Sequence, residues 1–223
     1  MSCKNIMIFN GSPRKKGTSY SFANAIKKLA EEMNCNADIY HIIDYSDEKL
    51  ELESLRDLLN KSDIILLAAP MYFDTFPYPV IWFFEKLIAE FYTELQGKSF
   101  FAVCQNGFPD ITLFEPMLGS CKCFAEAAHM KWLGGLAYSG GAIINGTPVE
   151  ELGGRGKKIT AGFRLALEDV LQNNKISSNA QDMITIKIPK LLYYPLAVFL
   201  NHRAKAAARN SGSKNLYAKV YLD

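Results

Sequence analysis

The residues best suited to chemistry lie in one short loop, residues 10–19, near the start of the chain. Gly11 and Gly17 permit a tight bend there. The loop also carries three hydroxyl groups and a guanidinium, those of Ser12, Thr18, Ser19 and Arg14. Guanidinium groups and the backbone N–H groups at a helix start both bind phosphate oxygens. The loop therefore predicts a phosphate site, because an ordinary turn would need fewer such donors.

The elements on either side of this loop can be read from hydrophobic spacing. An apolar run at residues 6–9 precedes it and predicts a strand. A helical pattern follows it, with one apolar face formed by Phe22, Ile26, Leu29 and Met33. A strand, a loop and a helix start in this order place the loop at the positive end of the helix dipole.

Similar alternation continues along the chain. Further strands are predicted at residues 37–43, 64–69, 99–104 and 132–138. Helical patterns lie at residues 52–59, 79–95, 114–128 and 159–170. The continuous apolar run at 64–69 is typical of a strand covered on both faces. We therefore expect an α/β domain with a parallel sheet and right-handed crossovers.

Two more loops should meet the first at the carboxyl edge of that sheet, where open α/β sheets bind ligands. The loop at residues 70–79 is stiffened by proline and rich in aromatic residues, which suits a flat conjugated ring. The loop at residues 105–110 contains Asn106 and Gly107, which can offer hydrogen bonds to the edge of a ring. A phosphate and a planar heterocycle together describe a mononucleotide.

These three loops resemble those of one flavoprotein family. The segments 10–14 and 17–19 (Asn-Gly-Ser-Pro-Arg and Gly-Thr-Ser) are similar to the FMN-phosphate loop of the flavodoxin-like NAD(P)H-dependent FMN and quinone reductases. Residues 70–73 (Pro-Met-Tyr-Phe) resemble that family's isoalloxazine loop, and residues 105–109 its third flavin-contacting segment. The resemblance covers residues 3–141 and weakens from residue 145 on.

The resemblance implies a fold, a cofactor and a set of contacts. The fold is a flavodoxin-like three-layer sandwich with a five-stranded parallel sheet in the order 2-1-3-4-5 and helices on both faces. The cofactor is FMN. The phosphate would be held by Ser12, Arg14, Thr18 and Ser19. The ring would be lined by Pro70, Met71, Tyr72 and Phe73, and its polar edge contacted by Asn106, Gly107 and Phe108.

The implied activity is oxidoreduction from NADH or NADPH through FMN to a quinone, flavin or similar small acceptor, in ping-pong order. FMN carries the chemistry, so no catalytic side chain and no metal ligand is predicted. The family also implies a homodimer with the flavin at the subunit interface. A flavodoxin-type electron carrier is the main alternative, although such carriers are typically strongly acidic and this chain has a net charge of +2. A flavin-binding sensor or interaction protein without turnover is the other.

Other chemistries find less support. The loop resembles the phosphate cradle of low-molecular-weight tyrosine phosphatases, but it begins with Asn10 and contains no cysteine nucleophile. Cys121 and Cys123 lie two apart on a predicted helix and so point to opposite sides, which does not suit an iron–sulfur cluster. The glycine-rich segment 153–156 lacks dinucleotide-binding spacing and is predicted to be a turn before a helix.

Composition limits the location and the partners. The chain has 223 residues, and its net charge is too small to indicate nucleic acid as a partner. No run approaches the ~18 apolar residues of a membrane span, and the start of the chain lacks the pattern of an export signal. Its five cysteines follow no disulfide framework. We therefore expect a cytoplasmic protein with reduced thiols and a small-molecule partner.

Two segments raise the question of what covers them. The helix at 79–95 has a broad apolar stripe on Val80, Phe84, Leu87 and Phe91, which predicts a second covered face, either at a homodimer interface or under the C-terminal segment. We divide the chain into a domain at residues 1–172 and an extension at residues 173–223. The apolar and basic part of the extension suits a membrane-contact helix. We predict instead that it is an arm packing on its own domain or on a partner subunit.

Overall fold

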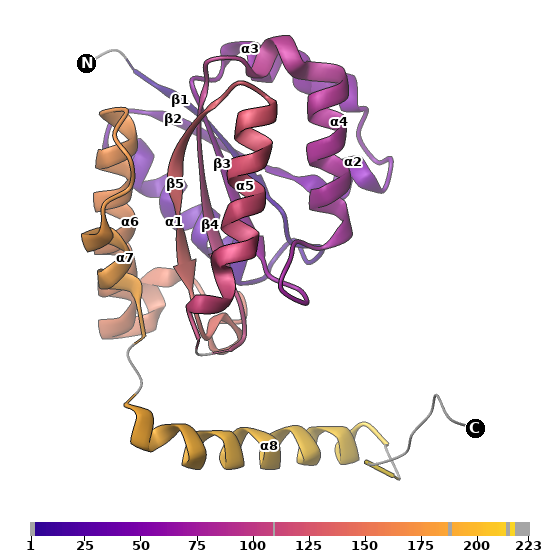
Figure 1. The fold of residues 1–223 in the computed structure, drawn as a ribbon, viewed down its shortest axis with the longest axis vertical. Helices are drawn as coiled ribbons and strands as arrows, with labels where there is room; N and C mark the ends of the chain where they lie inside the picture. The colour runs from indigo at the N-terminus through magenta and orange to yellow at the C-terminus, as the bar shows by residue number, and fades with distance from the viewer. Residues whose placement is uncertain (1–2, 109, 187–188, 213–214, 217–223) are drawn as a thin grey trace. The chain divides into compact units, whose positions relative to one another are not determined.

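Five parallel strands form one sheet in the order β2-β1-β3-β4-β5, which confirms the predicted flavodoxin-like architecture (Figure 1). The computed structural model describes residues 3–108, 110–186, 189–212 and 215–216. The strands are β1 (Asn5–Asn10), β2 (Asn36–His41), β3 (Ile64–Pro70), β4 (Ser99–Gln105) and β5 (Lys131–Tyr138). β2 ends earlier than predicted, because Ile42 and Ile43 turn into a short helix.

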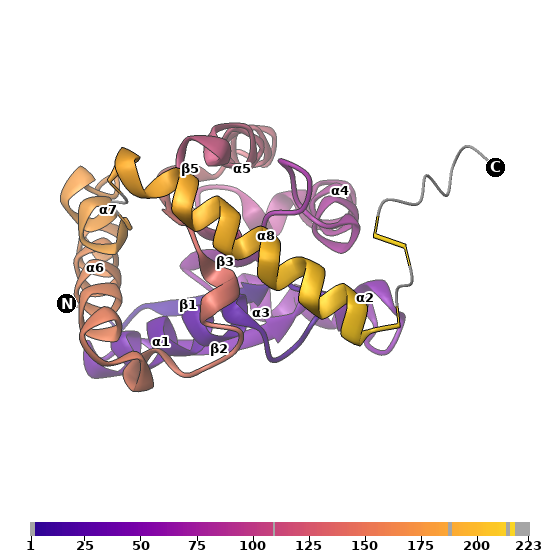
Figure 2. The same cartoon turned by 90° about the horizontal axis from the view of Figure 1, so that it is seen from below.

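Helices cover both faces of the sheet, and Figures 1 and 2 show the two helical layers on either side of it. The helices are α1 (Thr18–Glu32), α2 (Ile42–Ser46), α3 (Leu55–Lys61), α4 (Tyr78–Leu95), α5 (Glu115–Ala127), α6 (Gly153–Leu171), α7 (Ser178–Ile184) and α8 (Tyr193–Asn210). Helices α1, α6 and α7 bury one apolar cluster with the sheet, and α2 to α5 bury another.

Strand β1 shows why the sheet needs both layers. Ile6 and Ile8 belong to the cluster under α1 and α6, while Met7 and Phe9 belong to the cluster under α4 and α5. Successive side chains of a strand point to opposite faces, so an apolar run of this kind requires cover on both. Helix α1 meets that requirement with Phe22, Ile26 and Leu29, all buried as predicted.

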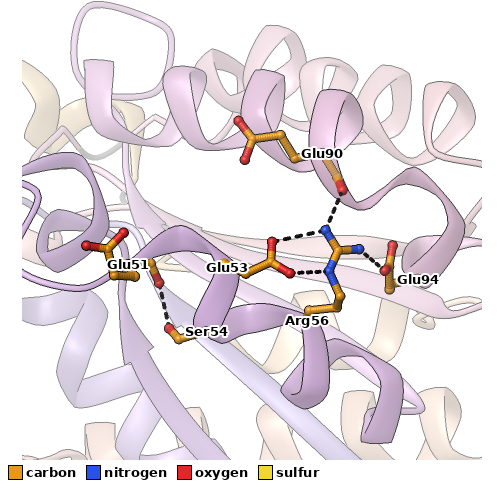
Figure 3. Close-up of polar contacts among 6 residues, drawn as sticks. All are labelled: Glu51, Glu53, Ser54, Arg56, Glu90 and Glu94. Atoms are coloured by element: carbon orange, nitrogen blue, oxygen red, sulfur yellow. Dashed lines mark hydrogen bonds and ion pairs between the residues drawn. The ribbon is translucent and has the colours of Figure 1, made fainter.

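Helix α4 contains a kink. Phe91 departs from helical geometry (φ −130°, ψ 23°). Arg56 of α3 donates from Nη2 to the Glu90 carbonyl at 3.3 Å and pairs with Glu53 and Glu94 (Figure 3). The Arg56 guanidinium also lies 4.9 Å over the Phe91 ring.

The buried stripe of α4 contains Val80, Leu87 and Phe91, as predicted, and differs from the prediction at Phe84. Phe83 is buried, whereas Phe84 is half-buried and stacks on Phe124 of α5. Ile81 and Tyr92 remain exposed. That a second subunit or the C-terminal segment covers these two side chains stays a prediction.

The glycine-rich segment at residues 153–156 is not a turn, and that prediction was wrong. It forms the first turn of α6. Close packing explains the glycine at position 156 of this helix, because a Cβ atom there would lie 2.0 Å from the carbonyl oxygen of Val149.

The chain divides into two compact units, Met1–Ile186 and Lys187–Asp223. The predicted domain boundary at residue 172 thus falls inside the first unit, since α7 packs against α6. Among the described residues, no helix is long and apolar enough to cross a membrane. Cys121 is buried and Cys123 exposed, in line with their predicted opposite directions.

Gly162 permits the close approach of α6 and α7. A Cβ atom there would lie 2.5 Å from Ile184 Cγ2 and 2.9 Å from the Ala180 carbonyl oxygen. We expect Gly162→Ala to lower the free energy of unfolding by about 1–3 kcal/mol, measured by urea denaturation, because the helices must separate. Gly119→Ala on α5 is the matched control. Nothing lies within 4 Å of its added carbon, so that variant should be neutral or more stable. Equal stability of the two variants would contradict tight packing at Gly162.

Candidate functional site

The side chain of Asn10 fixes the loop that follows β1. It is fully buried, and its Oδ1 accepts the N–H of Ser12 at 3.2 Å. Its Nδ2 donates to the carbonyl of Lys15 at 3.4 Å and lies 3.0 Å from Nδ1 of His41, at the end of β2. One amide therefore connects both ends of the loop to the neighbouring strand.

The same loop presents donors toward solvent at the start of α1. Gly17 caps the helix with extended backbone, so the first N–H groups of α1 have no partner within the helix. Ser12 Oγ accepts the N–H of Arg14 at 3.2 Å, which leaves the serine hydroxyl proton available. Arg14 itself is exposed. This arrangement can hold a dianionic phosphate.

Gly11 lets the loop pass close to the next helix. A Cβ atom on it would lie 2.7 Å from Val80 Cγ2 of α4 and 2.9 Å from Ala69 Cβ of β3. The first loop is thereby held against the start of the second.

The second loop, after β3, forms a two-residue hairpin. Tyr72 N–H donates to the Thr75 carbonyl at 2.8 Å, and Thr75 N–H returns a bond at 3.2 Å. Phe73 and Asp74 occupy the turn with φ values of 50° and 62°. Positive φ at both positions is usual for Asn-Gly and costly for a bulky aromatic residue. Phe73 is nevertheless fully exposed at the tip of the turn.

The third loop carries an amide without a partner. Asn106 is 3% exposed, and neither Nδ2 nor Oδ1 has a hydrogen-bond partner among the residues that the structure describes. Its backbone is fixed by an N–H bond to the Tyr138 carbonyl at 3.1 Å. Buried polar groups normally find partners, so this side chain is poised for one that is not part of the chain.

A fourth segment, residues 139–146, completes the site, and the sequence interpretation missed it. The Thr18 hydroxyl donates to the Gly141 carbonyl at 2.7 Å, and Gly141 N–H donates to the Asn106 carbonyl. A Cβ atom on Gly141 would lie 2.0 Å from Gln105 Oε1, and one on Gly146 2.5 Å from the Lys16 carbonyl oxygen. The signal was present: two glycines follow β5, whose carboxyl end lies on the same edge.

One cleft collects residues from all four segments. It is lined by Ser12, Arg14, Thr18, Pro70, Met71, Tyr72, Gln105, Asn106, Gly107, Gly141, Ala142 and Asn145. Three predicted site residues lie outside this lining. Ser19 is buried behind it and accepts from Gln105 Nε2 at 3.4 Å, while Phe73 and Phe108 are exposed. The cleft encloses about 110 Å³, enough for a phosphate or the edge of a ring.

Two larger hollows lie away from this edge. One, of about 470 Å³, includes Asn5, Lys27 and Asp38; the other, of about 440 Å³, includes Lys4, Lys98 and Lys131. Both involve the amino ends of strands. Ligands of open α/β sheets bind beyond the carboxyl ends, so the smaller cleft is the candidate site.

A lysine of the first loop forms an ion pair with a carboxylate of α2. Lys15 Nζ pairs with Asp44 Oδ1 of α2 at 2.6 Å. The pKa of His41 lies below its usual range, chiefly because burial disfavours the imidazolium and also because Lys15 is nearby, while Asp44 opposes this. A neutral His41 can accept the Asn10 amide proton.

Comparison with known proteins decides the assignment. Residues 4–108 match the model of the family described as NADPH-dependent FMN reductase. Residues 4–108, a little under half of the chain, therefore have the sequence pattern of an NADPH-dependent FMN reductase domain. This match supports the predicted flavin-dependent oxidoreductase with FMN as cofactor. A search of curated proteins gives no significant match.

Solved structures support the fold of this reductase domain. An NADPH-quinone reductase from P. pentosaceus has 17% identity and a TM-score of 0.53, over 73% of this chain and 95% of that one. General stress protein 14 from Treponema denticola, solved with FMN, has 10% identity and a TM-score of 0.51, over 81% and 95%. A flavone reductase has 12% identity and a TM-score of 0.57, over 75% and 64%.

The cleft of the reductase domain fits FMN in the character of its donors. Ser12, Arg14 and the start of α1 suit the phosphate. The unpartnered Asn106 amide offers one donor and one acceptor, which complement the N–H and C=O groups on the edge of a flavin ring.

The loop of the reductase domain should weaken in acid because of His41. Its pKa is depressed in the folded protein, so the unfolded chain takes up a proton first as the pH falls. We expect the free energy of unfolding of the apoprotein to be fully retained above about pH 6.5 and to fall below it. Urea denaturation across this range measures the effect. His41→Gln keeps an acceptor for Asn10 but does not titrate, so its acid slope should be flatter. An unchanged slope would assign the acid sensitivity to other groups.

The hairpin at Phe73 should store strain. We expect Phe73→Gly to raise the free energy of unfolding by about 1 kcal/mol, because glycine adopts positive φ without a steric penalty. Phe73→Ala is the matched control, since it removes the ring but keeps a Cβ atom in the same conformation. The alanine variant should show no such gain. Identical stabilities of the two variants would show that the turn holds no strain.

Proposed function

We propose that this reductase domain takes electrons from NADH or NADPH and passes them through FMN to a quinone, flavin or similar small acceptor, in ping-pong order. The observation that carries the proposal is the buried, unpartnered amide of Asn106 in the same cleft as a helix-start anion loop. The family match supports the redox class. We place the protein in the cytoplasm, in accord with its free cysteines.

The residues of the chain act by holding and orienting. Ser12 and Arg14, with the N–H groups at the start of α1, would bind the phosphate. Ser19 and Thr18 belong to the same cradle. Thr18 would contribute its hydroxyl on exchange of its bond to Gly141, while Ser19 would position Gln105.

The ring end would be held by the other loops. Pro70, Met71 and Tyr72 would lie along the ring, and Asn106 and Gly107 at its polar edge. Phe73 and Phe108, both exposed beside the cleft, would contact the part of the ring or acceptor that lies outside it.

When bound, FMN supplies the two-electron chemistry, receiving a hydride from the nicotinamide and delivering both electrons to the acceptor. The protein needs to present each flat substrate in turn at the same position, so orientation is its main contribution. The cleft encloses only about 110 Å³, so most of the flavin ring would lie outside it. A homodimer would cover it, and the exposed Ile81 and Tyr92 of α4 offer apolar surface for such an interface.

A steady-state assay tests the proposal directly. FMN-loaded protein should oxidise NADH or NADPH when a quinone or free flavin is supplied. If neither nucleotide is oxidised with any acceptor, the reductase proposal fails, and the protein is a flavodoxin-type carrier or a flavin-binding sensor. Parallel light scattering should show a dimer.

Arg14 should recognise the phosphate specifically. We expect Arg14→Ala to weaken FMN binding by about ten- to a hundredfold, since a charge-assisted hydrogen bond is lost, while riboflavin binding stays nearly unchanged. Quenching of flavin fluorescence measures both affinities. Lys16→Ala removes the same charge from the same loop at a residue outside the cleft, and should have a much smaller effect. Equal losses for FMN and riboflavin would place Arg14 away from the phosphate.

Asn106 should recognise the ring. Asn106→Leu should weaken FMN and riboflavin equally, by about tenfold, because both carry the same ring edge. It should also raise the stability of the apoprotein by about 1 kcal/mol, since an unsatisfied buried amide is removed. Flavin titration and urea denaturation measure the two effects. A variant with unchanged flavin affinity would exclude Asn106 from the flavin contacts.

A further inference from the structure

The second compact unit contains the helix α8, none of whose residues is buried within that unit. Residues 191–200, which run into this helix, are entirely apolar or aromatic. Leu191 is 86% exposed, Tyr194 80% and Phe199 55%. A contiguous exposed apolar segment of this size indicates a binding surface for another molecule.

The charge of this unit indicates which kind of partner it binds. Residues 187–223 contain seven Lys or Arg residues and one acidic residue. This segment therefore has a net charge of +6, in a chain whose total is +2. Its surface is complementary to an extended anionic partner.

Helical spacing sorts the two kinds of side chain in the second half of α8. His202, Lys205 and Arg209 recur at intervals of three and four and share one face. Ala204, Ala207 and Ala208 lie on the opposite face, in line with Leu196 and Leu200. The helix thus has one apolar stripe with Lys205 and Arg209 opposite it, and an apolar first half. Arg203 lies at the edge of the stripe, over the Phe199 ring.

We propose that α8 docks lengthwise on an anionic lipid surface. Amphipathic helices with basic residues on one face and large apolar residues on the other lie in the bilayer interface, held by apolar burial and by attraction to acidic headgroups. Tyr193 and Tyr194 suit the boundary between lipid and water. The helix lies on the membrane and does not cross it, consistent with its length and composition. This occupant differs from the intramolecular or intersubunit arm predicted from sequence.

Vesicle binding by the full chain tests this directly. The protein should co-sediment with vesicles of equal parts phosphatidylcholine and phosphatidylglycerol, and far less with phosphatidylcholine alone. Added salt should release it, because the attraction is screened. Failure to bind the anionic vesicles, or equal binding to both kinds, would overturn the proposal.

Paired variants locate the contact. Leu196→Ser with Leu200→Ser should lower the partition coefficient about tenfold or more through lost apolar burial. Lys205→Gln with Arg209→Gln should lower it about 25-fold, at roughly fivefold per cation. The matched control is Lys157→Gln with Lys158→Gln on α6, which removes the same charge from exposed residues of the first unit. An equal loss in this control would overturn docking through α8.

Folding and self-association are checked in the same samples. The unfolding midpoint of the first unit should be the same in all variants, so that a loss of vesicle binding reports on α8 alone. Light scattering measures the assembly state. If the α8 variants dissociate an oligomer while vesicle binding persists, a second copy is the occupant and the lipid proposal fails.

Discussion

The buried amide of Asn10 is the constraint on which the site depends. It bonds to Ser12 and Lys15 within the loop and to His41 at the end of β2. With the loop held in this form, its donors and the start of α1 face the same space as the loops after β3 and β4. A phosphate site assembled from flexible hydroxyls and a mobile arginine would lose affinity through the entropy of ordering them. Here the ordering is part of the folded state.

The remaining walls follow from sheet topology. Parallel strands bring their carboxyl ends to one edge, so each successive strand delivers its loop to the same place. The backbone bonds from Met71 to Gln105 and from Asn106 to Tyr138 carry this alignment past the ends of the strands. Among the described residues, the buried Asn106 amide has no hydrogen-bond partner, at a cost in stability that the proposed flavin contact would recover.

Much of this could be predicted from sequence because it depends on local pattern. The apolar runs identified the strands, and their order gave three loops whose residues Ser12, Met71 and Asn106 do line one cleft. The missing parts depend on contacts between distant segments. The role of Gly141 rests on a bond to Thr18 across 123 residues, which periodicity cannot show. The buried face of α4 was displaced from Phe84 to Phe83 in a helix that also contains a kink at Phe91.

The bond between Thr18 and Gly141 also bears on how the protein is made. It closes a loop of 123 residues, and closing a loop of that size carries a large entropic cost that local contacts must first reduce. The anion loop is synthesised well before its fourth wall, which follows β5. A nascent chain that ends at residue 108, the end of the family match, would contain the phosphate cradle without that wall. A cleft with all four walls can therefore form only after β5 has been synthesised and has joined the sheet.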